Sequence, residues 1–134
     1  MDPDLDLHHL RLAFRAAEQA RARGDHPFGA VLVGPEGDVW LEQGNGFATD
    51  GGDMTAHAKR LLAGIASRRF GAVLLRGCTL YVSAEPCAMC AGAIYWAGIG
   101  RVVFGAGQRP VEVVGPLLED EAARLQDGFW ADPA

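Results

Sequence analysis

The sequence predicts one α/β domain, a three-layer α/β/α sandwich around a mixed sheet of about five strands. Segments with apolar residues at helical spacing alternate with short apolar runs that are typical of buried strands. Turn residues separate these segments, and no repeat, low-complexity tract or interdomain linker interrupts residues 1–134. Strands that alternate with helices indicate a sheet covered by helices on both faces, so we expect a single domain with this layering.

The first third of the chain predicts a helix followed by a β-hairpin. Residues 5–23 carry apolar side chains near helical spacing, and Gly24 ends the pattern. Residues 28–33 form an apolar run that indicates a buried strand, and residues 34–38 have the composition of a turn. A second strand is expected over residues 39–42, so the two strands form a hairpin.

The middle of the chain predicts a loop, a helix, a strand and another helix. Residues 44–53 are polar and glycine-rich. Thr55 is expected to cap a helix that continues through residue 65, because its hydroxyl suits an N-cap position. An apolar run predicts a strand over residues 78–83, and a proline before residues 87–97 favours a helix there.

The last third predicts two short strands and a helix. The strands are expected over residues 102–104 and 111–114, and the helix over residues 117–129. Only residues 105–110 connect the two strands, whereas a parallel crossover needs about a dozen residues or more. Either the two strands are antiparallel, or a connecting segment is absent from this sequence.

The composition indicates an ordinary globular protein. Of 134 residues, 49% are hydrophobic and 22% are charged, which allows a core without disulfides. The net charge of −5 disfavours a polyanionic partner, so nucleic acid is a possible but less expected substrate. No apolar run approaches the ~20 residues of a membrane span, and the N-terminus lacks a secretory pattern. We therefore expect a cytoplasmic protein without membrane contact.

Two short motifs predict a metal site. They are Thr-Ala-His-Ala-Lys, which contains His57, and Glu-Pro-Cys-Ala-Met-Cys, which contains Cys87 and Cys90. Cysteines three residues apart share one face of a helix, and a helix N-terminus favours the thiolate form. One nitrogen and two sulfur ligands leave a fourth tetrahedral position open, as in catalytic zinc sites. Zn²⁺ is therefore the predicted cofactor, since a redox cysteine pair would leave His57 without a role.

These motifs resemble the cytidine and deoxycytidylate deaminase superfamily of zinc enzymes. The resemblance extends to Pro-Phe-Gly-Ala-Val at residues 27–31 and Gly-Ala-Ile-Tyr-Trp-Ala at residues 92–97, and the second run favours the guanine deaminases. The branch concerned also holds tRNA adenosine deaminases. The resemblance implies a cytidine deaminase-like fold and the deamination of a purine base or nucleoside, with tRNA adenosine as the alternative. It also implies a homodimer, with the helix over residues 91–97 as a candidate interface.

One residue departs from the family pattern at the centre of its chemistry. In these enzymes zinc activates a water that attacks the ring carbon bearing the amine, and a glutamate two residues after the histidine transfers protons. That position is Lys59, the only lysine among twelve lysines and arginines. A charged lysine offers donors and no acceptor, so we expect an inactive or impaired enzyme. Either Lys59 is natural, as in a non-catalytic zinc-binding pseudoenzyme, or it replaces glutamate in an active parent.

The resemblance also implies substrate contacts. Asn45 is expected to contact the base or sugar, although its position after Gly44 also suits a simple turn. Phe28 is either a wall of the pocket or part of the core, and Ala56 is expected beside the substrate. Other residues of interest are expected outside the site: Cys78 in a buried strand, and His8, His9 and His26 at the surface or as caps.

Overall fold

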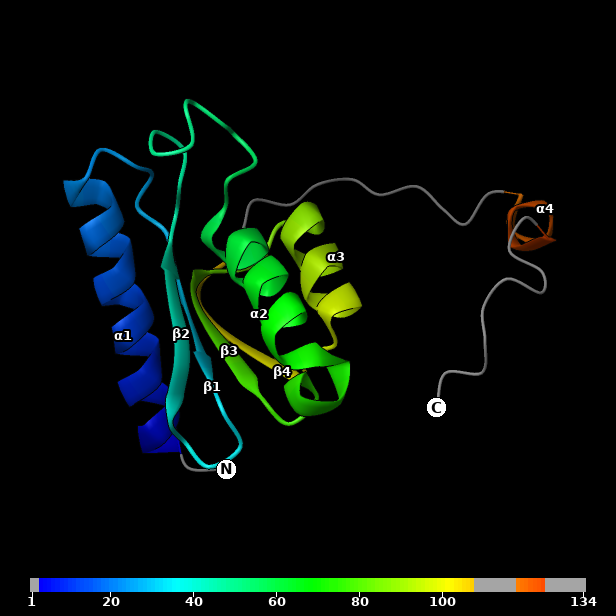
Figure 1. Ribbon diagram of the computed structural model, residues 1–134, viewed down its shortest axis with the longest axis horizontal. Coiled ribbons are helices and arrows are strands. Elements are labelled where there is room, and N and C mark those ends of the chain that lie inside the picture. The colour runs from blue at the N-terminus through cyan, green and yellow to red at the C-terminus, as the bar shows by residue number, and fades with distance from the viewer. Residues whose placement is uncertain (1–2, 108–117, 125–134) are drawn as a thin grey trace.

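Four strands form one mixed sheet at the centre of the molecule. The computed structural model describes residues 3–107 and 118–124. The strands are β1 (Gly29–Val33), β2 (Val39–Gly44), β3 (Thr79–Ala84) and β4 (Arg101–Ala106), in the spatial order β2-β1-β3-β4. Helix α1 (Pro3–Ala22) covers one face, and α2 (Ala58–Leu75) and α3 (Ala88–Ala97) cover the other (Figure 1). The predicted three-layer sandwich is confirmed.

The strand pairing combines a hairpin with a parallel crossover. β1 pairs antiparallel with β2, as the hairpin prediction required, and β1 also pairs antiparallel with β3. β3 and β4 are parallel and are connected through α3. The described residues contain four strands where about five were expected. The predicted strand over residues 111–114 and residues 108–110 of the junction before it lie outside them. Of the predicted last helix, only α4 (Glu119–Arg124) is described.

The core lies in two layers, one on each face of the sheet. Leu32 and Leu80 belong to the cluster beneath α2 and α3, whereas Val31 and Tyr81 belong to the cluster beneath α1. Neighbouring residues of a strand point to opposite faces, so a strand covered on both faces is apolar throughout. This explains why all of β1 is buried and why its sequence shows no alternation.

The start of α2 corrects a prediction. Thr55 does not cap this helix, because its N–H and its hydroxyl both donate to Asp53 Oδ1, at 2.8 and 2.7 Å. The helix begins at Ala58, with His57 in extended conformation at the N-cap position. It also continues to Leu75 instead of ending near residue 65, with a break from helical geometry at Gly71. The remaining predicted bounds within the described residues, α4 aside, differ by at most two residues.

A helix that crosses a membrane needs about 20 mostly apolar residues, and the described helices of this chain fall short of that. Among the described residues, none of them is both long and apolar enough to cross a bilayer.

Candidate metal centre

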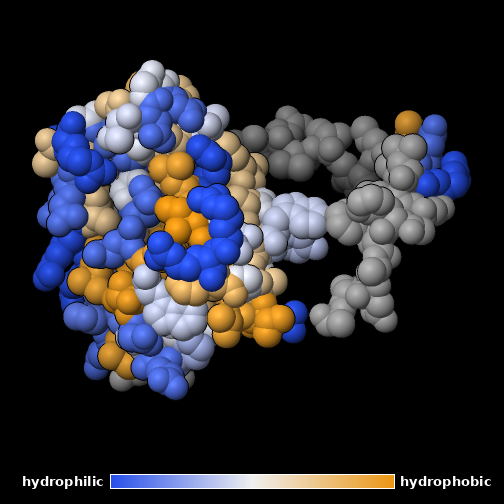
Figure 2. All heavy atoms as spheres, viewed as in Figure 1, coloured by the Kyte–Doolittle hydropathy of each residue, from blue (hydrophilic) through white to orange (hydrophobic). Residues whose placement is uncertain are grey.

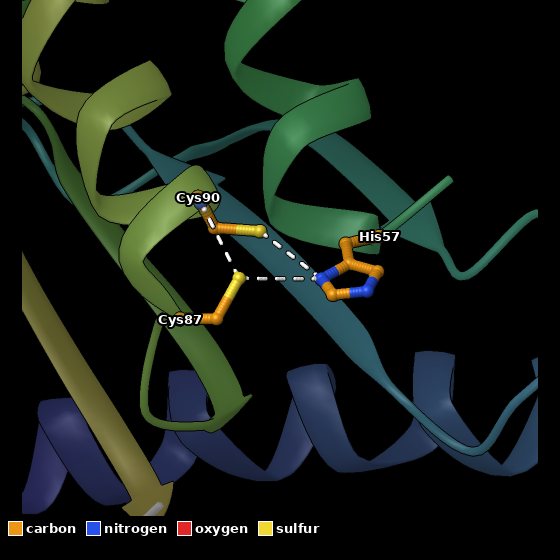
Figure 3. A group of neighbouring side chains, drawn as sticks. All are labelled: His57, Cys87 and Cys90. Carbon is orange, nitrogen blue, oxygen red and sulfur yellow. Dashed lines mark hydrogen bonds between the residues drawn. The ribbon is translucent and has the colours of Figure 1, made fainter. Parts of the chain in front are cut away.

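Three metal-binding side chains converge from the starts of two neighbouring helices. His57 is the N-cap of α2, and Cys87 is the N-cap of α3, with Cys90 in its first turn. His57 Nδ1 lies 3.5 Å from Cys87 Sγ and 3.4 Å from Cys90 Sγ (Figure 3). The ligand atoms of all three residues lie within 4.8 Å of one another. The structure thus brings together the three residues that the sequence predicted as ligands.

The spacing of these atoms fits a tetrahedral zinc ion. Zn–N bonds of about 2.0 Å and Zn–S bonds of about 2.3 Å place the nitrogen and sulfur atoms about 3.5 Å apart at tetrahedral angles. The two nitrogen–sulfur distances agree with this value. In the part of the chain that the structure describes, no further His, Cys, Asp or Glu joins the group. The protein therefore supplies three zinc ligands, His57, Cys87 and Cys90, and the fourth position is free for a small molecule.

The protonation of the ligands also suits a cation. Burial, and then the nearby Lys59, lowers the pKa of His57, which favours the neutral ring that binds metal. Burial opposes ionisation of Cys87, but hydrogen bonds, chiefly from the backbone of Cys90, outweigh it and lower its pKa. Burial and the neighbouring Cys87 raise the pKa of Cys90 to about 12. Two adjacent thiolates repel each other when no cation is bound, and a divalent cation between them offsets this repulsion.

Lys59 is buried close to this group. Its residue surface is 5% exposed, and its Nζ lies 5.5 Å from the centre of the Phe28 ring, within the range of a cation–π contact. Burial lowers the pKa of Lys59, whereas Cys90 and Cys87 raise it. The Lys59 side chain therefore occupies the interior next to the metal ligands and does not extend into solvent.

The expected substrate contacts lie on segments that are joined by hydrogen bonds. Asn45 follows β2 and is 2% exposed, and its N–H donates to the carbonyl of Phe28 at 3.0 Å. Gly46 N–H donates to the carbonyl of Ala56 at 2.9 Å, directly before His57. Phe28 is 38% exposed, so it is not a core residue. Asn45, Phe28 and Ala56 thus lie at the end of the sheet where α2 begins.

Sequence reasoning missed two acids that hold the loop between β2 and α2. Asp25 is buried, and its carboxylate accepts hydrogen bonds from the backbone N–H groups of Ala48 and Thr49. Asp53 holds Thr55 as described above and pairs with Arg60 at 3.8 Å. A single acid in a polar, glycine-rich stretch carries no pattern that distinguishes a buried acid from a solvated one.

The other residues considered from the sequence have mixed outcomes. Cys78 is buried next to β3, as expected. His8 is exposed and His26 is half-buried against Phe47, at 4.3 Å between ring centres. The expectation for His9 was wrong: it is 5% exposed and packs against Tyr81 at 5.2 Å, because this face of α1 lies on the sheet.

Known proteins share both the sequence pattern and the fold. The family model described as the cytidine and deoxycytidylate deaminase zinc-binding region matches residues 3–106. A probable cytosine deaminase of Schizosaccharomyces pombe is 38% identical over 153 residues, which cover 93% of this chain and 92% of the relative. A tRNA-specific adenosine deaminase of Bacillus subtilis is 39% identical over 143 residues, with 92% and 88% covered.

The structure is also similar to a solved structure of guanine deaminase from Bacillus subtilis. The TM-score is 0.68 at 29% identity, with 94% of this chain and 92% of that chain covered. The two sequence alignments above are longer than the 134 residues of this chain, so those relatives have residues without a counterpart here.

Proposed function

Because the chain belongs to the cytidine and deoxycytidylate deaminase zinc-binding family, we propose that its reaction is the hydrolytic deamination of a purine base or nucleoside, with a guanine-type base favoured. The observation that carries this is the group of His57, Cys87 and Cys90, whose atoms are spaced for zinc and leave one position open. Zinc held there would lower the pKa of a water molecule in the open position and make it a nucleophile near neutral pH.

The preference for guanine rests on the resemblance of one helix, and the structural similarity to a guanine deaminase is consistent with it. The run at residues 92–97, on α3, resembles guanine deaminases, and the similarity to the Bacillus subtilis guanine deaminase covers nearly the whole chain. The Schizosaccharomyces pombe relative, named as a probable cytosine deaminase, makes cytosine the competing small base. Both candidates are free bases, so both belong in the same assay.

A tRNA substrate is the second candidate, because the Bacillus subtilis tRNA-specific adenosine deaminase is 39% identical. An open groove of about 610 Å³ lies between α1, β2 and α2, and Arg23, Arg60 and Arg68 contribute to its lining. Glu42 and Asp50 line the same groove, and two of the arginines pair with acids. On this face hydrophilic residues surround small hydrophobic patches (Figure 2). None of the three metal ligands lines this groove, and its mixed charges offer a polyanion no continuous basic surface.

We assign low activity to the chain as it stands because of Lys59. A charged lysine cannot accept the proton of the attacking water, and general acid–base groups typically contribute roughly 10²–10⁴-fold in rate. Asn45 is proposed to hydrogen-bond the substrate, and the partly exposed ring of Phe28 to form a wall of its pocket. Ala56 is proposed to line the pocket beside His57.

A substrate screen tests the proposed function. The zinc-loaded Lys59→Glu variant is assayed for ammonia release from guanine, adenine, cytosine and their nucleosides, and from tRNA. We expect release from guanine above all, with the parent chain near background. If ammonia is released only from cytosine, or only from tRNA, that compound replaces guanine as the assigned substrate. Absence of release from every compound would identify a non-catalytic zinc-binding pseudoenzyme.

We also propose that the chain forms a homodimer through α3. This helix exposes two large aromatic side chains, Tyr95 at 75% and Trp96 at 68%. Aromatic residues of this kind are enriched at protein interfaces.

A further inference from the structure

The loop that carries Asn45 is attached to the segment before β1 by hydrogen bonds in both directions. Asn45 Oδ1 accepts from the backbone N–H groups of His26, at 3.3 Å, and Phe47, at 2.7 Å. In return, Arg23 Nη2 donates to the carbonyl of Asn45 at 3.4 Å. The conformation of Asn45 therefore depends on residues about twenty positions earlier in the chain.

Asp25 is the centre of this attachment. Its Oδ1 accepts from the N–H groups of Ala48 and Thr49 at 2.8 and 2.9 Å, and its Oδ2 accepts from the Thr49 hydroxyl at 2.8 Å. Arg23 Nε donates to the same Oδ2 at 3.2 Å. The carboxylate side chain is inaccessible to solvent, so every bond it makes is shielded from competing water.

The amide of Asn45 has its oxygen occupied and its nitrogen available. Both hydrogen bonds to the side chain involve Oδ1, which also identifies the oxygen in this amide. Among the described residues Nδ2 has no hydrogen-bond partner, and the Asn45 side chain is almost fully buried. Asn45 consequently offers N–H donors to a ligand and no acceptor.

We propose that Asp25 is a positioning residue for the substrate: it holds the loop over residues 45–49 so that Asn45 keeps its oxygen on the backbone and presents only N–H donors. This inference rests on the proposed function, in which Asn45 contacts the substrate. It adds a chemical requirement, because the substrate has to present an acceptor, such as a carbonyl oxygen or an unprotonated ring nitrogen, towards Asn45.

The first measurement needs no substrate. Amide hydrogen exchange is followed by NMR in the parent chain and in Asp25→Asn, which removes the charge and one acceptor oxygen at nearly unchanged size. The N–H groups of His26 and Phe47 report directly on Asn45 Oδ1. We expect their exchange to accelerate at least about tenfold in the variant, while the amides of β3 stay protected. Unchanged exchange at both amides would overturn the proposal.

The second measurement separates positioning from stability. In the zinc-loaded Lys59→Glu background, Asp25→Asn should raise KM for guanine at least about tenfold and change kcat less than about threefold. The same substitution in an Asn45→Ala background should have little further effect, because the group being positioned is gone. Asp38→Asn is the matched control, since it makes the same charge change in the exposed hairpin between β1 and β2.

Each remaining outcome leads to a decision. If Asn45→Ala raises KM and Asp25→Asn does not, or if the two effects simply add, Asp25 does not position Asn45. If Asp25→Asn fails to fold, Thr49→Val replaces it, with Thr49→Ser as the variant that retains the hydroxyl donor. We expect KM to rise about threefold or more for Val and to stay near the parent value for Ser. If no base is deaminated, the proposed function fails, and hydrogen exchange alone decides whether Asp25 holds Asn45.

Discussion

A buried lysine, Lys59, lies two residues after the zinc ligand His57, and we propose that it limits proton transfer at the site. Lys59 is 5% exposed and lies against the Phe28 ring, so its side chain stays at the site. Glutamate at this position would place an acceptor near the open zinc position, whereas the ammonium places a second positive charge there. On this proposal the one residue would affect both proton transfer and the charge balance of the zinc site.

Substitution of this residue should restore catalysis. We expect Lys59→Glu to raise kcat/KM for deamination of the true substrate at least about 10²-fold, because a carboxylate accepts the proton of the water and returns it to the ring. Lys59→Gln should restore little, since an amide has no ionisable acceptor. Steady-state ammonia release across the three forms checks this. Equal turnover by the Lys and Glu forms would show that position 59 does not transfer protons.

At the scale of elements, the zinc site is made by two helix starts. Cys87 accepts the N–H of Cys90 at 3.5 Å as the cap of α3, and His57 directly precedes α2. The helix start thus favours the thiolate of Cys87, whereas burial raises the pKa of Cys90. The core beneath α2 and α3 holds the two helix starts in place.

Zinc content is the corresponding test. We expect about one zinc per chain by elemental analysis of reduced, zinc-supplied protein, because no ligand lies at position 59. Cys87→Ala and Cys90→Ala should each abolish high-affinity binding. Cys78→Ala is the matched control, as Cys78 is buried outside the metal group and the variant should keep its zinc. Zinc-free parent protein under these conditions would refute the site.

The loop between β2 and α2 should make stability depend on pH through Asp25. Hydrogen bonds from Thr49, and then from Arg23 and Ala48, lower the pKa of Asp25 to about 2 against the opposing effect of burial. The unfolded value is about 3.9, so the folded state favours the ionised carboxylate. The ionised carboxylate therefore stabilises the folded state at a pH above the pKa that Asp25 has in the unfolded chain. This contribution is lost as the pH falls from about 4 to about 2.

Thermal unfolding of Asp25→Asn measures this contribution. At pH 6 the variant should have a lower Tm than the parent, and the difference should shrink as the pH falls towards 2. Acid also removes zinc from both proteins. This loss lowers both Tm values, so it does not contribute to the difference between them. Asp38→Asn, in the exposed hairpin, should not show this pattern. A Tm difference that stays constant from pH 6 to pH 2 would contradict the assignment.

At the scale of the whole molecule, the faces of α3 differ in what they contact. Ile94 and Ala97 face the core, whereas Tyr95 and Trp96 are exposed and contact each other edge-on at 5.4 Å between ring centres. Two adjacent exposed aromatic side chains form an apolar surface that a partner would shield from water.

The oligomeric state tests this surface. Light scattering of the parent chain at micromolar concentration should give about twice the 14.2 kDa of one chain. The double change Tyr95→Glu and Trp96→Glu should shift the mass towards one chain, because burying two carboxylates in an interface is costly. Val73 is an exposed residue of α2, so Val73→Glu is a control for the added charge, and this variant should remain a dimer. A single-chain mass for the parent would contradict the dimer.

The sequence by itself determined the types of element, the layering and the metal ligands. Apolar periodicity and turn residues are local properties, so α1, the hairpin and α3 could be predicted to within two residues. The ligands could be predicted because His57, Cys87 and Cys90 have the required chemistry and lie in motifs that resemble those of a zinc family. The departure at Lys59 was visible for the same reason, since it is the identity of one residue within a motif.

Only the tertiary structure decided which polar groups are buried and what they bind. Asp25 is held by Thr49 and Ala48, which lie more than twenty positions later in the chain, and no local pattern encodes that contact. Helix α2 begins at Ala58, and Thr55 does not cap it, because the Thr55 hydroxyl is bonded to Asp53. His9 is buried because α1 turns that face to Tyr81 of the sheet. Burial and hydrogen bonding depend on segments distant in sequence, so they emerge only when the layers pack.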